Sequence, residues 1–254
     1  MFGTGYLDQI WTTLNRASDL SEGDRDAFFA LPFRSRPVEA GEAIEREDAA
    51  PHDCFAIVTG FAYSSKVLRD GSRQILSVHM PGDFLNTASL IHPGTAQDIQ
   101  MLTPGRLASI SSTALHHLLA QHPRIERALW RQTAIEASIF GEWIANIGRR
   151  DAQARVAHLL CEFALRLRTV EDGDDGTFDV PMTQGQLADA TGLTAVHVNR
   201  VLQKLNRAGL IRCNVKSVTI EDMQGLAAAA DFDERYLGER LVRGSRTAAT
   251  PIPT

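Results

Sequence analysis

The stretch that decides the fold is TAVHVNRVLQKLNRAGLI at residues 194–211, which directly follows GQLADATGL. Thr194 is a suitable N-cap for a helix, and Gly209 can end that helix in the left-handed region. A shorter helix begins after Thr183, and Gly192 permits a tight turn between the two. Two helices joined by a short glycine turn are typical of a helix-turn-helix, and the following LIRCNVKSVTIED predicts a hairpin wing.

The second of these helices carries polar and basic side chains on the face that we expect to point outward. Arg200 can donate two parallel hydrogen bonds to guanine, and Asn199 can offer a donor and an acceptor to adenine. His197 suits phosphate or water better than a base. A solvated arginine and a helix-surface asparagine without a role in recognition remain the alternatives. The apolar residues that recur at helical spacing, and that we expect to face the core, are Val198, Val201, Leu202 and Leu205.

Basic residues gather in this part of an acidic chain. The formal net charge is −5 over 254 residues, yet no Asp or Glu stands between Asp189 and Glu221. A local excess of positive charge is typical of phosphate binding. We therefore predict contacts to DNA from Thr183, Thr194, Val196, His197, Asn199, Arg200, Lys204, Arg212 and Lys216.

The composition is that of an ordinary globular protein, with 44 % hydrophobic and 22 % charged residues. No apolar run approaches the roughly 18 residues of a membrane span, and the N-terminus lacks a signal-peptide pattern. Cys54, Cys161 and Cys213 are isolated, which argues against a disulfide framework or a thiolate metal site. We expect a cytoplasmic protein that does not contact a membrane.

In the first half of the chain, the spacing of the apolar residues is typical of strands rather than of helices. Between Pro37 and about Ser111, short strand-like runs such as CFAIVTGFAYSSKVL and RQILSVHM are separated by turn residues. This pattern predicts an antiparallel β-roll or barrel. Before it, residues 6–30 favour a helix with one apolar face made of Leu7, Ile10, Trp11 and Leu14.

Residues 123–149 predict a long helix that begins at Pro123, a good first-turn residue. Its apolar stripe could pack on its own β-domain, but a second copy of the same helix suits a stripe of this length better. Asp151 then caps a further helix, DAQARVAHLLCEFALRL, and residues 169–181 predict an acidic loop. The residues expected at the two-fold contact are Ile125, Leu129, Gln132, Ile135, Ile139 and Trp143.

With its β-roll, its long helix, the run RDAQARVA and the helix-turn-helix sequence, the chain resembles the Crp/Fnr family, that of the cyclic-AMP receptor protein and its anaerobic relatives. The resemblance covers about residues 20–225. It implies an α+β fold: an N-terminal antiparallel β-roll like a cyclic nucleotide-binding domain, a long dimerisation helix and a C-terminal winged helix-turn-helix. It also implies a homodimeric transcription regulator that binds a pseudo-palindromic operator in double-stranded DNA, with RNA polymerase as a further candidate partner.

The expected division of the chain follows from this resemblance. Residues 1–119 should hold the N-terminal helices and the β-roll, and residues 120–150 the dimerisation helix. Residues 151–232 should form the DNA-binding domain. The tail at 233–254 contains RLVRGSRTAATPIPT, which lacks periodicity, and we expect it to be mobile.

The base-reading side of the resemblance is only partly kept. The family's base-reading arginine maps onto Arg200, whereas its base-reading glutamate falls on Val196. Valine cannot accept a hydrogen bond from cytosine N4, so the operator should differ from the best-known operators of the family.

The effector side departs further, within PGDFLNTASLIHPGTAQDIQ. The receptor protein's phosphate-binding Arg and Ser become Gln97 and Asp98, and its adenine-contacting Thr and Ser become Phe140 and Gly141. A carboxylate at the phosphate position is repulsive, so we do not expect cyclic-AMP binding. The candidate effector-pocket residues are therefore Asn86, Thr87, Gln97, Asp98 and Phe140.

Two hypotheses for regulation remain. In the first, an unidentified signal at the β-roll gates DNA binding. In the second, the dimer is constitutive or gated by a protein partner, and a degenerate β-roll binds no small molecule. A small molecule retained on the purified protein would discriminate between them. The operator sequence and the sign of the transcriptional effect stay open.

Motifs for catalysis or metal binding are missing from the sequence. There is no phosphate-binding glycine loop, nucleophile elbow or H-E-x-x-H run. His158 and Cys161 stand three apart on one predicted helix, but core packing explains them better than a metal. The run His52-Asp53-Cys54, in an expected loop, is too weak a pattern for a metal site. We expect no enzyme, no metal site and no identifiable cofactor.

Overall fold

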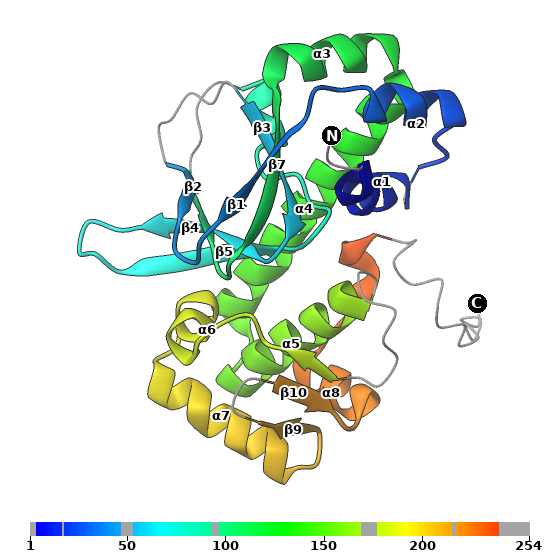
Figure 1. The fold of residues 1–254 in the computed structure, drawn as a ribbon. Helices are drawn as coiled ribbons and strands as arrows, with labels where there is room; N and C mark the ends of the chain where they lie inside the picture. Colours follow the sequence, from blue (N-terminus) through cyan, green and yellow to red (C-terminus); the bar gives the residue numbers. More distant parts are fainter. Residues whose placement is uncertain are drawn as a thin grey trace.

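The computed structural model describes residues 4–16, 18–46, 53–92, 97–168, 177–214 and 217–238. It contains an N-terminal roll of strands, a long helix and a C-terminal helical unit that follow one another along the chain (Figure 1). The predicted α+β fold, with a β-roll before a winged helix-turn-helix, is confirmed.

The N-terminal segment is two helices rather than one. A 3₁₀ turn η1 (Thr4–Leu7) leads into α1 (Asp8–Asn15), and α2 (Glu22–Phe29) follows after a break. The break arises because Ser21 and Asp24 form a capping box, in which each side chain accepts from the backbone N–H of the other. The predicted apolar face is buried as expected: Leu7, Ile10, Trp11 and Leu14 all lie in the core.

The roll consists of two antiparallel sheets, in the orders β1-β7-β3 and β2-β6-β4-β5. A 3₁₀ turn η2 (Thr87–Leu90) lies between β5 and β6. The turn at Gly82, where φ is +95°, needs glycine because a Cβ there would lie 2.1 Å from Thr13 Oγ1 of α1. The strands are β1 (Arg34–Val38), β2 (Ala43–Glu45), β3 (Asp53–Thr59), β4 (Ala62–Val67), β5 (Arg73–His79), β6 (Asp98–Met101) and β7 (Gly105–Ser111).

Some elements of the roll escaped the sequence pattern. The quoted apolar runs identified β3, β4 and β5, but β1 and β2 are largely exposed or very short and carry little alternation. The expected loop at His52-Asp53-Cys54 is wrong for two of its residues. Asp53 and Cys54 begin β3, where Cys54 is buried and pairs with Ile110 of β7. His52 lies outside the described residues.

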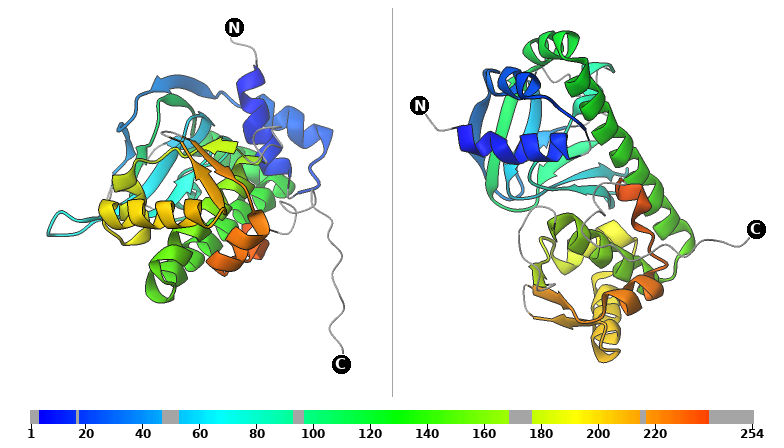
Figure 2. Two further views of the ribbon diagram at one scale, coloured as in Figure 1. Left: turned by 90° about the horizontal axis from the view of Figure 1, so that it is seen from below. Right: turned by 90° about the vertical axis from the view of Figure 1, so that its right-hand side faces the viewer.

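The roll is joined to the C-terminal unit by α3 (Ser112–Gln121) and α4 (Pro123–Arg149). The long helix begins at Pro123 and ends at Arg149, as predicted. Figure 2 shows α4 running along the roll and continuing to the C-terminal unit, so that one helix touches both halves. None of the helices in the described ranges is long and apolar enough to cross a membrane.

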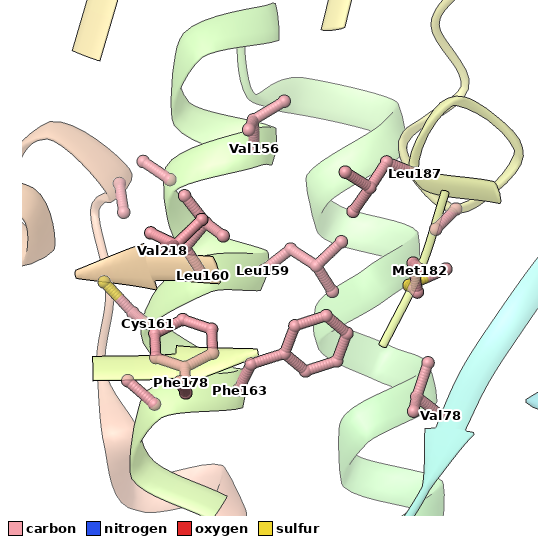
Figure 3. Close-up of a cluster of buried hydrophobic side chains, with 14 of the residues drawn as sticks. Val78, Val156, Leu159, Leu160, Cys161, Phe163, Phe178, Met182, Leu187 and Val218 are labelled. Atoms are coloured by element: carbon pink, nitrogen blue, oxygen red, sulfur yellow. The ribbon is translucent and has the colours of Figure 1, made fainter. Parts of the chain in front are cut away.

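The C-terminal unit is built around α5 (Ala152–Arg168). Asp151 caps this helix as predicted, since its Oδ1 accepts from Ala154 N at 2.9 Å. Figure 3 shows Val156, Leu159, Leu160 and Phe163 of α5 in a common core with side chains from neighbouring elements. These elements are β8 (Thr177–Asp179), α6 (Gln184–Thr191), α7 (Ala195–Arg207), β9 (Ile211–Cys213), β10 (Ser217–Ile220) and α8 (Met223–Ala230).

Two expectations about this unit need correction. The predicted acidic loop at 169–181 contains β8, which pairs with β10 and extends the wing to three strands. Residues 233–238 do not behave as a mobile tail: the 3₁₀ turn η3 (Glu234–Leu237) packs on α4, and Leu237 is buried. The rest of that tail, 239–254, lies outside the described residues.

Candidate nucleic-acid interface

The helix-turn-helix is fixed by local capping chemistry. Thr183 forms a capping box with Gln186 at the start of α6, and Thr194 Oγ1 accepts from His197 N at 3.2 Å at the start of α7. Gly192 and Gly209 adopt φ of +64° and +70°. The predicted boundaries of both helices are therefore confirmed. Thr183 and Thr194 remain exposed, at the starts of the two helices.

The second helix buries and exposes the predicted faces. Val198, Val201 and Leu205 are buried in the C-terminal core. Val196 is 62 % exposed, and Arg200 and Lys204 are exposed on the same side of α7. No acidic residue occurs on α7, so its outward face is uncompensated positive charge.

Asn199 is less available than the sequence suggests. Its side chain is half-buried, and its Oδ1 accepts from Gln203 Nε2 at 2.9 Å. Gln203 in turn accepts from Arg207 Nη2 at 3.3 Å, which makes an i, i+4 chain along the helix. Gln203 was missed in the sequence, although its place one turn after Arg200 could have indicated it. One of the two lone pairs of the Asn199 carbonyl oxygen is therefore already occupied, which leaves one for a base.

The wing has the predicted hairpin, with β9 and β10 paired antiparallel. Arg212 on β9 lies in an ion pair with Glu221, with Nε and Oε1 3.0 Å apart. Both side chains are well exposed, so this pair is weak and leaves Arg212 able to turn toward phosphate. Lys216 lies outside the described residues, and its role stays a prediction.

A carboxylate beside the interface is neutralised by the roll. Asp189 of α6 accepts from Arg73 Nε at 2.9 Å and from Arg73 Nη2 at 2.8 Å. Arg73 belongs to β5, and Gln74 beside it donates to the carbonyl of Ala190 at 3.4 Å. The β4–β5 hairpin therefore holds the first helix of the helix-turn-helix.

The candidate effector residues do not form one open pocket wall. Asn86 is buried, and its side chain hydrogen-bonds to the backbone of β3. Its Oδ1 accepts from Phe55 N at 3.0 Å, and its Nδ2 donates to Asp53 O at 3.1 Å. Thr87 is buried against α4, with its Oγ1 2.7 Å from Thr133 Oγ1. These two residues tie the segment before β6 to β3 and to α4.

The other three candidates lie on two different elements, β6 with its preceding residue and α4. Gln97 directly precedes β6, and Asp98 is its first residue, opposite Ser65 of β4. Both side chains are half-buried and engaged by other groups of the chain. Phe140 is half-buried on α4.

The predicted two-fold contact on α4 stays a prediction, and burial within the chain favours another face of the helix for it. Four of its six residues are buried within their own protomer: Ile125 and Leu129 in the core with α1 and α3, and Ile139 and Trp143 in the core with α5. Gln132 and Ile135 are half-buried on the same inward side. The helical spacing of the apolar residues correctly predicted that one face of α4 is buried. That face is buried by other elements of the same chain.

The outward face of α4 is different in kind. Exposed arginines stand near both ends of the helix, and between them the exposed side chains are small apart from Ile144, which is 72 % exposed; Ala145 is half-buried. The small residues recur at alternating spacings of four and three positions, the spacing of a coiled-coil seam. They are Ala134, Ser138, Gly141, Ala145 and Gly148.

His158 and Cys161 are core residues, as predicted. Both are fully buried, and His158 Nδ1 lies 3.0 Å from Asn146 Nδ2 while its ring stacks on Tyr236. Burial lowers the pKa of His158 to about 3, so its imidazole is neutral. Within the described ranges, no group of three His, Cys, Asp or Glu side chains is placed to hold a metal.

Known proteins resemble both halves of this arrangement. The cyclic nucleotide-binding domain profile matches residues 35–122, and the Crp-like helix-turn-helix profile matches residues 154–229. The transcriptional activator protein FnrL of Cereibacter sphaeroides is 28 % identical over 205 residues, or 78 % of this chain and 81 % of FnrL. The structure of FixK2 from Bradyrhizobium japonicum matches with a TM-score of 0.71 at 26 % identity, covering 78 % of this chain and 98 % of FixK2. The chain belongs to the Crp/Fnr family of transcription regulators.

Membership of the Crp/Fnr family establishes the coarse function. The chain is a transcription regulator with a DNA-binding helix-turn-helix and a domain of the cyclic nucleotide-binding fold, and it is not an enzyme. The anaerobic regulatory protein of Haemophilus influenzae, 24 % identical over 82 % of this chain and 80 % of its own length, agrees with this assignment. The geometry of α7 then indicates which side chains of this Crp/Fnr regulator are exposed on that helix.

Replacing Arg200 should separate base reading from phosphate binding. Arg200→Ala should cost about 1–3 kcal/mol on the preferred DNA and relax the preference at one base pair, because a bidentate contact to guanine is lost. Lys204→Ala, on the same exposed face, should weaken preferred and scrambled DNA alike and lower the salt slope by about one charge. Fluorescence anisotropy over a salt series measures both. Equal losses on both DNAs would make Arg200 a phosphate anchor, and no loss in either variant would exclude this face.

Proposed function

We propose that this chain acts in the cytoplasm as a homodimer that binds a pseudo-palindromic operator and regulates transcription, with RNA polymerase as a partner. The observation that carries the proposal is the outward face of α7, which is basic, exposed and held by caps at both ends. A helix of this kind fits the major groove, and a dimer would place two of them on successive half-sites.

The outward face of α4 supports the dimer. A seam of alanine, serine and glycine lets two helix backbones approach closely, and Ile144 beside it would be covered in the process. A two-fold contact is self-complementary, so one such face is sufficient for the assembly.

The signal at the roll is, on our proposal, not cyclic AMP. A carboxylate at Asp98 and the bulk of Phe140 stand where the resemblance implies a phosphate-binding serine and an adenine-contacting threonine. Placing the cyclic phosphate beside that carboxylate would be repulsive. We therefore propose gating by a different signal at the roll.

The alternative is a constitutive or protein-gated dimer whose roll binds no small molecule. This alternative is supported by Asn86 and Thr87, whose side chains already form hydrogen bonds with other residues of the same chain. Mass spectrometry of small molecules retained on the purified protein distinguishes the alternatives, since only a ligand-gated roll should retain one.

Selection of bound DNA from a random pool tests the function itself. We expect enrichment of a sequence with two inverted half-sites whose centres lie about one helical turn, or a multiple of it, apart. A guanine that Arg200 reads should occur in each half-site. Failure to enrich any sequence would contradict sequence-specific binding, and enrichment of a single half-site would contradict the dimer.

The dimer is tested by placing charge on the small-residue seam. Ala134→Glu combined with Gly141→Glu should give monomers, because like charges would face each other across the two-fold axis. Glutamate favours a helix more than glycine does, so α4 itself should persist. Sedimentation velocity at micromolar concentration measures the assembly, and Arg124→Glu, on an exposed site near the start of α4, is the control. A monomeric wild type would overturn the proposal.

Calorimetry tests the proposed effector specificity. Cyclic AMP and cyclic GMP should show no saturable binding at physiological concentrations, because Asp98 repels their phosphate. A double variant, Gln97→Arg with Asp98→Ser, restores the charge pattern that the resemblance implies. Any gain in nucleotide affinity should appear only in that variant. A micromolar dissociation constant for the wild type would contradict the prediction.

A further inference from the structure

A cavity of about 110 Å³ lies where the roll, α4 and the C-terminal unit meet. Its walls come from α1, the end of β5 and the turn after it, α4, α5 and the end of η3. None of the candidate effector residues, Asn86, Thr87, Gln97, Asp98 or Phe140, lines it. The cavity is therefore distinct from the region of the roll in which a cyclic nucleotide would be expected.

Polar groups in this cavity lack partners. Glu136 Oε1, Gln132 Oε1 and Thr13 Oγ1 are buried and, within the described residues, have no hydrogen-bond partner. His79 Nδ1 lies 3.8 Å from Glu136 Oε1, beyond hydrogen-bond distance. A buried polar atom without a partner costs about 1–3 kcal/mol, so three of them around one cavity indicate an occupant that can hydrogen-bond.

The charge around the cavity is positive on balance. Arg16, Arg131 and Arg166 line it, and so does Asp83. Asp83 accepts from Arg166 Nη2 at 2.9 Å, and the charge of Arg16 also acts on it. Arg166 has Glu162 as a second carboxylate partner, which leaves one guanidinium charge in excess if Glu136 is neutral.

Glu136 is indeed better accommodated as the neutral acid. Burial away from water raises its pKa to about 8, with a further increase from Asp83 that the charge of Arg166 only partly offsets. His79 does not supply a counter-charge, because burial lowers its pKa to about 3. At neutral pH the carboxyl group of Glu136 is therefore a hydrogen-bond donor, as are the hydroxyl of Thr13 and the guanidinium of Arg131.

From this arrangement we propose that the cavity binds a small organic carboxylate. Its carboxylate would accept from Arg131, Thr13 and Glu136, and its short apolar part would pack on Ile135 and Ile139. It would not satisfy Gln132 Oε1, which can only accept. An empty apolar cavity of about 150 Å³ accommodates benzene, so about 110 Å³ suits an acid of three or four carbons.

The site would couple to the DNA-binding unit, a consequence that rests on the proposed function. Asp83 comes from the roll and Arg166 from α5, and Leu237 and Gly238 close the cavity from the end of η3. A ligand that contacts all of these favours the one arrangement of the two units in which they lie together. Ligand binding should therefore change operator affinity.

Propionate is the probe for the site, measured by calorimetry on the full chain without DNA. We expect saturable binding with a dissociation constant in about the millimolar range, as suits so small a ligand. Propanol and propylammonium, of similar size, should not bind detectably. Equal binding of propanol would overturn the carboxylate assignment, and no binding of propionate would mean that the cavity holds water only.

Variants on α4 test the assigned roles. Arg131→Gln should weaken propionate binding roughly ten-fold or more, whereas Arg127→Gln, exposed one turn away, should leave the affinity unchanged.

Wild-type affinity for propionate should fall about ten-fold per pH unit above about 8, because ionised Glu136 repels the ligand. Glu136→Gln keeps a donor without the charge, so it should bind at pH 7 and lose this pH dependence. A wild-type pH profile in Glu136→Gln, or unchanged affinity in Arg131→Gln, would overturn the proposal. Because no DNA is present, these outcomes are independent of whether the proposed operator binding holds.

Discussion

The buried guanidinium of Arg166 is the interaction on which the relative placement of the parts depends. It donates to Val78 O at 2.8 Å and to Asp83 Oδ2 at 2.9 Å in the roll, and to Glu162 on its own helix at 3.3 Å. Glu162 is fully buried and accepts from Trp143 of α4 and Tyr236 of η3. Each of these partners satisfies a buried charge or hydrogen-bonding group that would otherwise have no partner. Breaking a buried ion pair of this kind costs about 3–5 kcal/mol. The roll is therefore held by Arg166 of α5, and the long helix and the C-terminal turn by Glu162, with which Arg166 is paired.

A second, weaker contact bears on the orientation of the helix-turn-helix. The pair between Arg73 and Asp189 keeps about a third of each side chain exposed, at 34 % and 31 %. Solvent screens such a pair, so its contribution is small compared with that of the buried network. The two contacts therefore differ in strength. The buried network keeps α5 against the roll, whereas little free energy is needed to separate α6 from the β4–β5 hairpin. Movement of the DNA-binding helices should begin at that hairpin.

What the sequence predicted well was local. The caps at Thr183 and Thr194 and the turn at Gly192 depend on residues within one helical turn, and their chemistry is nearly the same in any protein. What it missed was set by distant partners. The chain segment at 233–238 has no periodicity of its own, and it is ordered because Tyr236 meets Glu162 and Leu237 meets α4. Likewise β8 gains its place only by pairing with β10. The pairing of Asp189 with Arg73 joins residues that no local pattern relates.

The apolar stripe of α4 shows why periodicity alone could not assign an interface. A stripe of period 3.6 states that one face is buried and says nothing of what buries it. Four large apolar residues of that stripe, Ile125, Leu129, Ile139 and Trp143, are covered within their own protomer by α1, α3 and α5. Small residues remain on the other face, where close approach of two backbones matters more than side-chain volume. Since Glu136 and Ile139 lie on the inward face and Gly141 on the outward one, a shift of α4 caused by anything in the cavity would also move the proposed seam. One rigid helix would thereby connect the state of the cavity with the spacing of the two recognition helices.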